Sequence, residues 1–363
     1  MSAGRDDGSK KDPDHGTDQP PADEILRRFH IFKTPGANFD VHAASERELI
    51  VHGLPPRPNP RTHPHLAAKW RRVADQRPLF IRPELLLIPS IRKQTDTALI
   101  TRRKVTDSEL VRYHDKLAEL VTADRANEMV KVFKRLPETS NNWSGAYVKR
   151  PAAEPLTTVT GQWTVPGVKP PASAKTATGY VDGTYLVGDW VGIDGTNGTS
   201  DVMQAGTASQ CVVSGGKVTA TTFFAWVEWF SLPSIMFANF AVDAGDLISC
   251  TVCAPLGNTH GTAMFNNLTS GVTANVGIDP PSGVSLTGNV AEWIVEDPGQ
   301  SGGGLFPFPN YGSTHFHDCH AGTKNIELDL ASGIEIDMLS GGKVISAAYI
   351  ESNRTLFCRY GSL

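Results

Sequence analysis

The sequence lacks any hydrophobic run that approaches the length of a membrane-spanning helix, and residues 1–24 contain no apolar core. The first absence argues against a membrane protein, because a spanning helix needs about 20 predominantly apolar residues. The second absence leaves no visible secretory signal peptide, since such a peptide requires an apolar central region. Secretion would therefore need an unconventional route or a leader outside this chain, and the location stays open.

Positive charge is scarce in the second part of the chain. Residues 141–363 hold 9 Lys and Arg against 18 Asp and Glu, whereas residues 1–140 hold 25 against 20. The two parts nearly cancel in the total net charge of -4. Because phosphate recognition needs a basic footprint, the larger acidic part is not expected to bind nucleic acid. The charge split itself predicts two segments with different roles.

Cysteine is sparse as well, with 5 in 363 residues. An odd number cannot pair completely within one chain, and so few cysteines exclude a disulfide-stapled scaffold while leaving one or two bridges open. Cys250 and Cys253 form a C-x-x-C, but they lie in an alternating segment typical of a strand. Positions three apart on a strand point to opposite faces, which disfavours a shared metal and favours simple packing.

Composition divides the chain into three regions. Residues 1–24 are charged and almost free of large apolar side chains, which predicts a disordered tail. Residues 25–138 form a basic region that we expect to be partly helical, because helical spacing occurs at His65–Asp75, Thr106–Val121 and Ala123–Leu136. The Pro-rich stretch at residues 53–64, directly before the first of these segments, cannot make a large core, so this region is predicted to be accessory.

Residues 139–363 consist of short alternating segments bounded by Gly, Pro, Asn and Asp. The predicted strands are Trp143–Val148, Thr157–Val165, Asp189–Gly192, Val202–Gly206, Thr222–Phe230, Leu247–Ala254, Thr262–Asn267, Val290–Val295, Ser313–His317, Ile326–Leu330 and Val344–Ile350. Many short strands with almost no helical periodicity predict a single all-β domain, either a sandwich or a barrel. Its length of about 220 residues suits a large, jelly-roll-like sandwich better than an immunoglobulin-type one.

Several of these strands carry polar residues at central positions. By alternation, Gln204, Glu228 and Glu292 each share a strand face with apolar neighbours, and Trp190 and Asp194 share a face if their strand extends that far. A carboxylate in such a place is costly unless it is exposed or hydrogen-bonded. The pattern fits either a solvated sheet face or a functional site, and periodicity alone does not separate the two.

Seven short sequence motifs in this region help to decide between a solvated sheet face and a functional site. They are N-N-W-S-G-A-Y-V (141–148), V-T-G-Q-W-T-V-P (159–166), W-V-G-I-D-G (190–195), Q-A-G-T (204–207), W-V-E-W-F (226–230), N-N-L-T-S-G (266–271) and A-E-W-I-V-E-D (291–297). In this order and approximate spacing, the set resembles the glutamic peptidase (eqolisin) family over about residues 140–360. The resemblance implies a concanavalin-like sandwich of two antiparallel sheets, in agreement with the strand pattern, and endopeptidase activity in acid by a Gln/Glu dyad.

The resemblance also assigns the dyad. The family's glutamine lies in a Q-T-G word after W-V-G-I-D-G, which falls on Gln204 in Q-A-G-T. The family's glutamate lies in N-A-E-[FW]-I-x-E-D, which falls on Glu292, with Val290 in place of the usual asparagine. Three further residues fall on positions that look like substrate-binding or supporting residues: Trp190, Asp194 and Glu228.

These residue types suit hydrolysis by an activated water. Glu292, as a carboxylate, can take a proton from water, and Gln204 can donate a hydrogen bond to the developing oxyanion. The protonated glutamic acid can then return the proton to the leaving amine, so neither a metal nor another cofactor is required. We expect polypeptide substrates, acid conditions, a monomer, and no nucleic-acid or membrane partner. A domain poor in Lys and Arg would also avoid positive self-repulsion in acid.

Other classes of protein match less well. No G-x-S-x-G elbow lies in a strand–helix context, and the paired D-[TS]-G words of aspartic proteases are absent. His315, His317 and Cys319 would share one strand face as half of a metal site, although an exposed or hydrogen-bonded edge is the simpler interpretation. The rival from another class is a non-catalytic carbohydrate- or peptide-binding sandwich, because tryptophan can stack on sugars. The presence of both Gln204 and Glu292 favours the enzyme.

The basic N-terminal region has two interpretations. Residues 25–138 could be a propeptide that docks on the acidic domain and is released when acid protonates the carboxylates. They could equally be a stabilising extension without a regulatory role. The sequence leaves both open.

Overall fold

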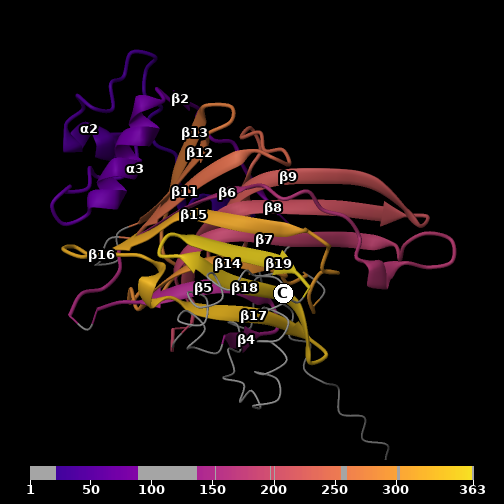
Figure 1. Cartoon of the computed structure of the whole chain (residues 1–363). Helices are drawn as coiled ribbons and strands as arrows, with labels where there is room; N and C mark the ends of the chain where they lie inside the picture. The colour runs from indigo at the N-terminus through magenta and orange to yellow at the C-terminus, as the bar shows by residue number, and fades with distance from the viewer. Residues whose placement is uncertain are drawn as a thin grey trace, which may run out of the picture.

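Long antiparallel strands dominate the computed structural model, which describes residues 22–88, 137–151, 153–196, 198–199, 201–254, 260–300 and 303–361. They form two facing layers of sheet, with the N-terminal region against one end (Figure 1). The predicted helices Thr106–Val121 and Ala123–Leu136, and most of the predicted tail, lie outside the described residues.

The first layer is built around three long strands. β7 (Gly183–Asp194) pairs with β8 (Val202–Ser214), and β8 pairs with β9 (Lys217–Trp229), all antiparallel. The pairing continues from β9 to β10 (Ile235–Phe237) and β3 (Leu85–Leu87), and from β7 to β14 (Val290–Glu296), β5 (Trp143–Lys149) and β17 (Ile334–Ser340). β4 (Glu138–Ser140) lies parallel to β17.

The second layer covers one face of the first. Its order is β19 (Thr355–Tyr360), β15 (Ser313–Gly322), β6 (Thr158–Thr164), β11 (Leu247–Cys253), β12 (Gly261–Asn267) and β13 (Val272–Ile278), again antiparallel. β18 (Lys343–Ser352) pairs with both β17 and β19 and so joins the two layers, while β16 (Glu327–Leu328) pairs with the end of β15. Short 3-10 turns occur at Ala172–Ala174 and Leu330–Ser332.

The main hydrophobic core lies between these layers. Buried side chains from both layers form one cluster, including Val191 and Trp293 from the first layer and Trp163 and Phe265 from the second. The two buried indoles are satisfied across the interface: Trp163 Nε1 donates to Thr207 Oγ1 at 2.8 Å, and Trp293 Nε1 donates to a β6 carbonyl at 2.9 Å. The predicted all-β sandwich of two antiparallel sheets is therefore confirmed.

The N-terminal region extends the edges of both layers. It contains α1 (Ala22–Leu26), β1 (Phe29–His30), α2 (Glu46–Val51), α3 (Pro64–Asp75) and β2 (Leu79–Phe80) ahead of β3. β1 and β2 pair with the outer edge of β13, whereas β3 pairs with β10. α3 matches the predicted helix at His65–Asp75, and α1 begins at Ala22, before the expected end of the tail. The region contacts the sandwich over several separate strands (Figure 1).

All five cysteines are free and buried, so the bridges that the sequence left open do not form. Cys250 and Cys253 pack within or near the core, as the strand pattern predicted. Among the described residues, none of the helices has the length and apolar character needed to cross a membrane.

Candidate active site

The predicted dyad residues lie on one row that crosses the first layer. Register places Glu292 of β14 directly opposite Tyr147 of β5 and opposite Gly192 of β7. Gly192 is in turn opposite Gln204 of β8, which is opposite Glu228 of β9. Residues directly opposite each other in antiparallel strands project to the same face. These five residues, here called the polar row, therefore share one face, as the dyad prediction required.

Gly192 separates the two predicted catalytic side chains. Adjacent strands lie about 4.8 Å apart, so the Cα atoms of Glu292 and Gln204 are about 10 Å apart across the glycine. Since Gly192 has no side chain, nothing of its own fills the space between them. The row lies on the face turned away from the second layer, where Trp143, Trp190 and other apolar side chains form a separate cluster.

Gln204 is held by Glu228. Its Nε2 donates to Glu228 Oε1 at 3.1 Å, and Ser234 Oγ donates to Glu228 Oε2. Gln204 and Glu228 are both buried, and Gln204 Oε1 has no partner among the described residues. Burial raises the pKa of Glu228 to about 7, against the opposing effect of the bonds from Ser234 and Gln204. The contacts fix the amide so that its oxygen and its second N–H remain for another group.

Glu292 is more deeply buried than Gln204 and Glu228. Its side chain is 0% exposed, and neither carboxylate oxygen has a hydrogen-bond partner among the described residues. Burial raises its pKa well above the ordinary value, and the nearby charges of Asp194 and Glu296 add to this shift. A carboxyl group with a raised pKa and unused hydrogen-bonding capacity is a recurring mark of a functional site.

Asp194 holds the loop that leads into β14. Its two carboxylate oxygens accept hydrogen bonds from the backbone N–H groups of residues 287–290, at 2.5 to 3.4 Å, and from the Thr287 hydroxyl. It ends β7 with a φ of 66°, on the same side as Trp190 and Gly192, so the strand extends as far as the sequence required. Asp194 is fully buried. It affects Glu292 in two ways: its hydrogen bonds hold the backbone before β14, and its charge helps to raise the pKa of Glu292.

Trp190 packs on the same face of the sheet as the polar row. Its Nε1 donates to Glu296 Oε2 at 2.8 Å, and its ring stands edge-on to Trp143 with centroids 5.0 Å apart. The Trp190 ring also approaches the position that a Cβ on Gly192 would occupy, at 2.9 Å from Cζ3. Trp190 therefore packs against Gly192, beside the polar row.

The prediction that His315, His317 and Cys319 share one strand face is wrong. A register shift in the pairing of β15 with β6 lies between His317 and His320, and Asp318 has a φ of 49°. The irregularity breaks the alternation, so His315 and His317 remain exposed while Cys319 turns into the core. The three side chains therefore do not form half of a metal site.

Sequence reasoning assigned no role to four residues that the structure brings to this site. Tyr147 and Gly192 occupy the polar row, Ser234 donates to Glu228, and Glu296 accepts from Trp190. Tyr147, Gly192 and Glu296 stand inside the recognised words, which was the available signal. Ser234 lies outside those words and is brought near by the turn between β9 and β10.

A cavity of about 380 Å³ lies elsewhere, between α3 and the outer face of the second layer. Lys69, Trp70, Ser249 and Asn266 are among its lining residues, and no member of the polar row lines it. Its location gives it no part in the chemistry of Gln204 and Glu292.

Comparison with known proteins identifies the family of the chain. The Peptidase A4 family model matches residues 141–360. The chain is similar to aspergillopepsin-2 of Aspergillus niger, 29% identical over 227 residues, which are 60% of this chain and 76% of the relative. It is also similar to scytalidopepsin B of Scytalidium lignicola, 26% identical over 242 residues, or 62% and 84% of the two chains.

The fold has a solved counterpart as well. A crystal structure of scytalido-glutamic peptidase with a transition state analog inhibitor aligns with a TM-score of 0.50 and 24% identity. The alignment covers 61% of this chain and 98% of that chain, so the sandwich corresponds to nearly all of the solved molecule.

The fold and the family match together define a glutamic-type peptidase, a hydrolase of polypeptides built on a β-sandwich. The chain belongs to the Peptidase A4 family. This assignment favours the enzyme over the non-catalytic carbohydrate- or peptide-binding alternative.

Proposed function

We propose that the protein cleaves internal peptide bonds in acid, with Glu292 and Gln204 acting on a water molecule between them. The observation that carries the proposal is the register of the polar row, which puts both side chains on one face with only Gly192 between them. The two groups are close enough to act on one scissile bond from opposite sides, because each side chain spans part of the gap of about 10 Å.

The reaction needs one proton to move twice. Ionised Glu292 takes a proton from the water as the water oxygen attacks the scissile carbonyl carbon. Gln204 donates its second Nε2 hydrogen to the oxyanion, while the first stays on Glu228. Protonated Glu292 then gives its proton to the amine nitrogen, the C–N bond breaks, and the carboxylate is restored. No bond forms between enzyme and substrate.

The supporting residues keep this geometry. Glu228 fixes the amide of Gln204, Asp194 fixes the loop before β14, and Trp190 packs against Gly192 on the face of the polar row. All of them belong to a single chain, so the site needs no second copy and we expect a monomer. Size-exclusion chromatography coupled to light scattering would test this.

Acid dependence follows from the ionisation of Glu292. In the full chain, its burial raises the pKa, so the carboxyl group holds its proton and cannot act as a base in acid. We expect that removal of residues 25–138 would rehydrate the group and lower its pKa toward the acid range. Glu292 can then act as a base in acid, where the leaving amine is still readily protonated.

The N-terminal region fits the role of a propeptide in this scheme. Strand β3 is followed by Ile88, which packs in the same cluster as Trp143 and Trp190 on the face of the polar row. Elsewhere, Arg72 pairs with Asp318 at 2.5 Å and His65 with Glu327 at 3.1 Å, so basic groups of the region meet carboxylates of the sandwich. We expect acid conditions to weaken the attraction between the basic region and the acidic sandwich and so to favour release.

One variant and a matched control test the dyad. Gln204→Ala should lower kcat by about 100-fold to 1,000-fold, the usual cost of removing one oxyanion donor. Asp189→Asn is the matched control, since Asp189 is a buried carboxyl on the same strand as Gly192 but on the opposite face. It should cleave at the wild-type rate.

A truncated chain tests whether the N-terminal region acts as a propeptide. A chain beginning at Ser140 should cleave faster than the full chain at the onset of an acid assay, since it lacks residues 25–138. The proposal for the dyad is wrong if Gln204→Ala cleaves as fast as the control. The proposal for the propeptide is wrong if the full chain shows no delay and no processed product.

A further inference from the structure

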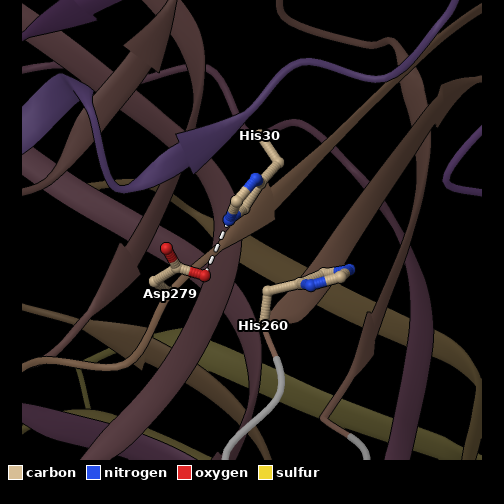
Figure 2. A group of neighbouring side chains, drawn as sticks. All are labelled: His30, His260 and Asp279. Carbon is tan, nitrogen blue, oxygen red and sulfur yellow. Dashed lines mark hydrogen bonds and ion pairs between the residues drawn. The ribbon is translucent and has the colours of Figure 1, made fainter.

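Two histidines and an aspartate meet where the N-terminal region joins the second layer. His30 Nε2 lies 2.7 Å from Asp279 Oδ1, and the His30 and His260 rings have centroids 5.0 Å apart, tilted by 43°. One nitrogen from each ring and one carboxylate oxygen all lie within 4.8 Å of one another. Figure 2 shows His30 and Asp279 pointing toward each other, with the His260 ring beside them.

Strand register explains why these side chains gather. His30 of β1 is opposite Gly277 of β13, and Gly277 is opposite Thr262 of β12. His260 directly precedes β12 and Asp279 directly follows β13, each two residues from Thr262 or Gly277, so continued alternation directs them to the same face. The three groups thus come from segments far apart in sequence but occupy neighbouring places on one surface.

Gly277 provides the room for the cluster. A Cβ at this position would lie 3.0 Å from His30 Cβ and 3.3 Å from His260 Cδ2. Any larger residue would push the two imidazoles apart. The nearby Arg28 guanidinium is occupied elsewhere, donating to the Pro280 carbonyl at 3.0 Å and to Ser282 Oγ at 3.3 Å.

We propose that His30, His260 and Asp279 bind a zinc ion that fastens strand β1 to the catalytic sandwich. Imidazole nitrogens and a carboxylate oxygen are ordinary zinc ligands, and three protein ligands leave a fourth position for water. A tetrahedral ion with bonds of about 2.1 Å places its ligands about 3.4 Å apart, so small rotations of the side chains complete the site. Two neutral imidazoles and one carboxylate also offer the ion a net negative charge.

The second histidine cluster does not offer the same geometry. His65 and His320 stack with an interplanar angle of 8°, so the in-plane lone pairs of the two rings cannot converge on one ion. Glu327, the third member, already accepts hydrogen bonds from the backbone N–H groups of His65 and Leu66 at the start of α3. The rings of His30 and His260 are tilted by 43° and not stacked, so their nitrogens can face one ion.

This site would be a property of the N-terminal region together with the sandwich. His30 lies outside residues 141–360, the part of the chain that the family model matches. Bound zinc would therefore hold residues 22–88 in place at the edge of β13, independently of the chemistry at Glu292.

Zinc binding to the full chain tests the proposal. After removal of metals with a chelator, the protein is titrated with zinc chloride at neutral pH by calorimetry, and with cobalt(II) by visible absorption. We expect one ion per chain and the absorption bands of a tetrahedral cobalt site. His30→Ala and His260→Ala should each weaken zinc binding by at least about tenfold.

Two controls separate this site from incidental binding by surface histidines. His42→Ala removes a similar pair, since His42 Nε2 lies 2.8 Å from Asp75 Oδ1 with an equally exposed imidazole, and it should leave zinc binding unchanged. His317→Ala should also have no effect, although the His315 and His317 rings are only 5.9 Å apart.

A further variant and a local measurement keep the result independent of misfolding. Asp279→Asn retains a hydrogen-bond partner for His30 but removes the charge, and it should also lose affinity. Hydrogen exchange of the peptide containing Phe29 and His30 should slow on addition of zinc in the wild type and not in His260→Ala. The proposal is overturned if the wild type binds no zinc, if the affinity survives in both His30→Ala and His260→Ala, or if it is lost in either control. None of these outcomes depends on peptidase activity.

Discussion

A buried carboxyl group outside the active site gives a sharp test of how this sandwich responds to acid. Asp189 is 0% exposed, and its Oδ1 accepts a hydrogen bond from Thr314 Oγ1 at 2.8 Å. Burial raises its pKa from 3.8 to about 7, against the opposing effect of that bond. Because the folded pKa lies above the unfolded value, Asp189 favours folding most below pH 4, and this advantage is lost as the pH rises to about 7.

The substitution Asp189→Asn removes this pH dependence. Asparagine keeps an acceptor for Thr314 but never ionises, so it resembles the protonated acid. A shift of about 3 pH units corresponds to about 4 kcal/mol, at 1.36 kcal/mol per unit. Above pH 7, Asp189→Asn should therefore raise the free energy of unfolding by up to about 4 kcal/mol, whereas at pH 4 it should change little.

Urea unfolding followed by tryptophan fluorescence at pH 4 and pH 8 measures both values. Each protein carries Glu292→Gln so that self-digestion does not alter the sample. Asp182→Asn is the control, because Asp182 is exposed and accepts bonds from the Gly215 and Gly216 amides, which lower its pKa. That variant should show no gain at pH 8. An equal effect of Asp189→Asn at both pH values, or a loss at pH 8, would refute the reasoning.

Two other substitutions have defined outcomes. Gly192→Ala should lower kcat/KM in acid by about 100-fold, because its methyl group would enter the polar row and lie 2.9 Å from Trp190 Cζ3. Gly188→Ala, whose nearest contact would be 3.7 Å, should stay near the wild-type rate, and equal rates for both variants would contradict the role of the gap. Lys69→Met should raise the melting temperature at pH 6, because burial lowers the pKa of the Lys69 amine to about 8 and its charge costs about 3 kcal/mol. This amine has no hydrogen-bond partner among the residues that the structure describes. A lower melting temperature would show that the amine finds a partner.

Strand alternation revealed the sandwich but not the length of its strands. The segments around Trp143, Val202 and Val290 were found because their turns and β-branched residues are clear. β7 was predicted from Asp189 only, since the strand is buried on both faces and shows little alternation before that residue. β1 and β2 have two residues each, too few for any periodic signal.

At the site, the sequence identified the candidate catalytic residues but not how strand pairing arranges them. The words of the sequence named Gln204 and Glu292, yet only the pairing of β14, β7 and β8 shows that they share a row across Gly192. The His315 and Cys319 prediction failed because one irregular residue, Asp318, reverses the alternation, and sequence pattern carries no sign of it. Contacts such as that of Ser234 with Glu228 depend on a turn whose geometry the pattern does not specify.

The pH profile of one variant tests whether Glu292 is the catalytic base. Wild-type protein and Glu292→Gln are compared for cleavage of an unfolded protein substrate between about pH 2 and pH 7, a range that spans carboxyl titration. The assignment of Glu292 as the base predicts cleavage by the wild type in the acid part of this range and a rate at least about 1,000-fold lower for Glu292→Gln at every pH. A variant that cleaves within tenfold of the wild type, with the same pH profile, would contradict it.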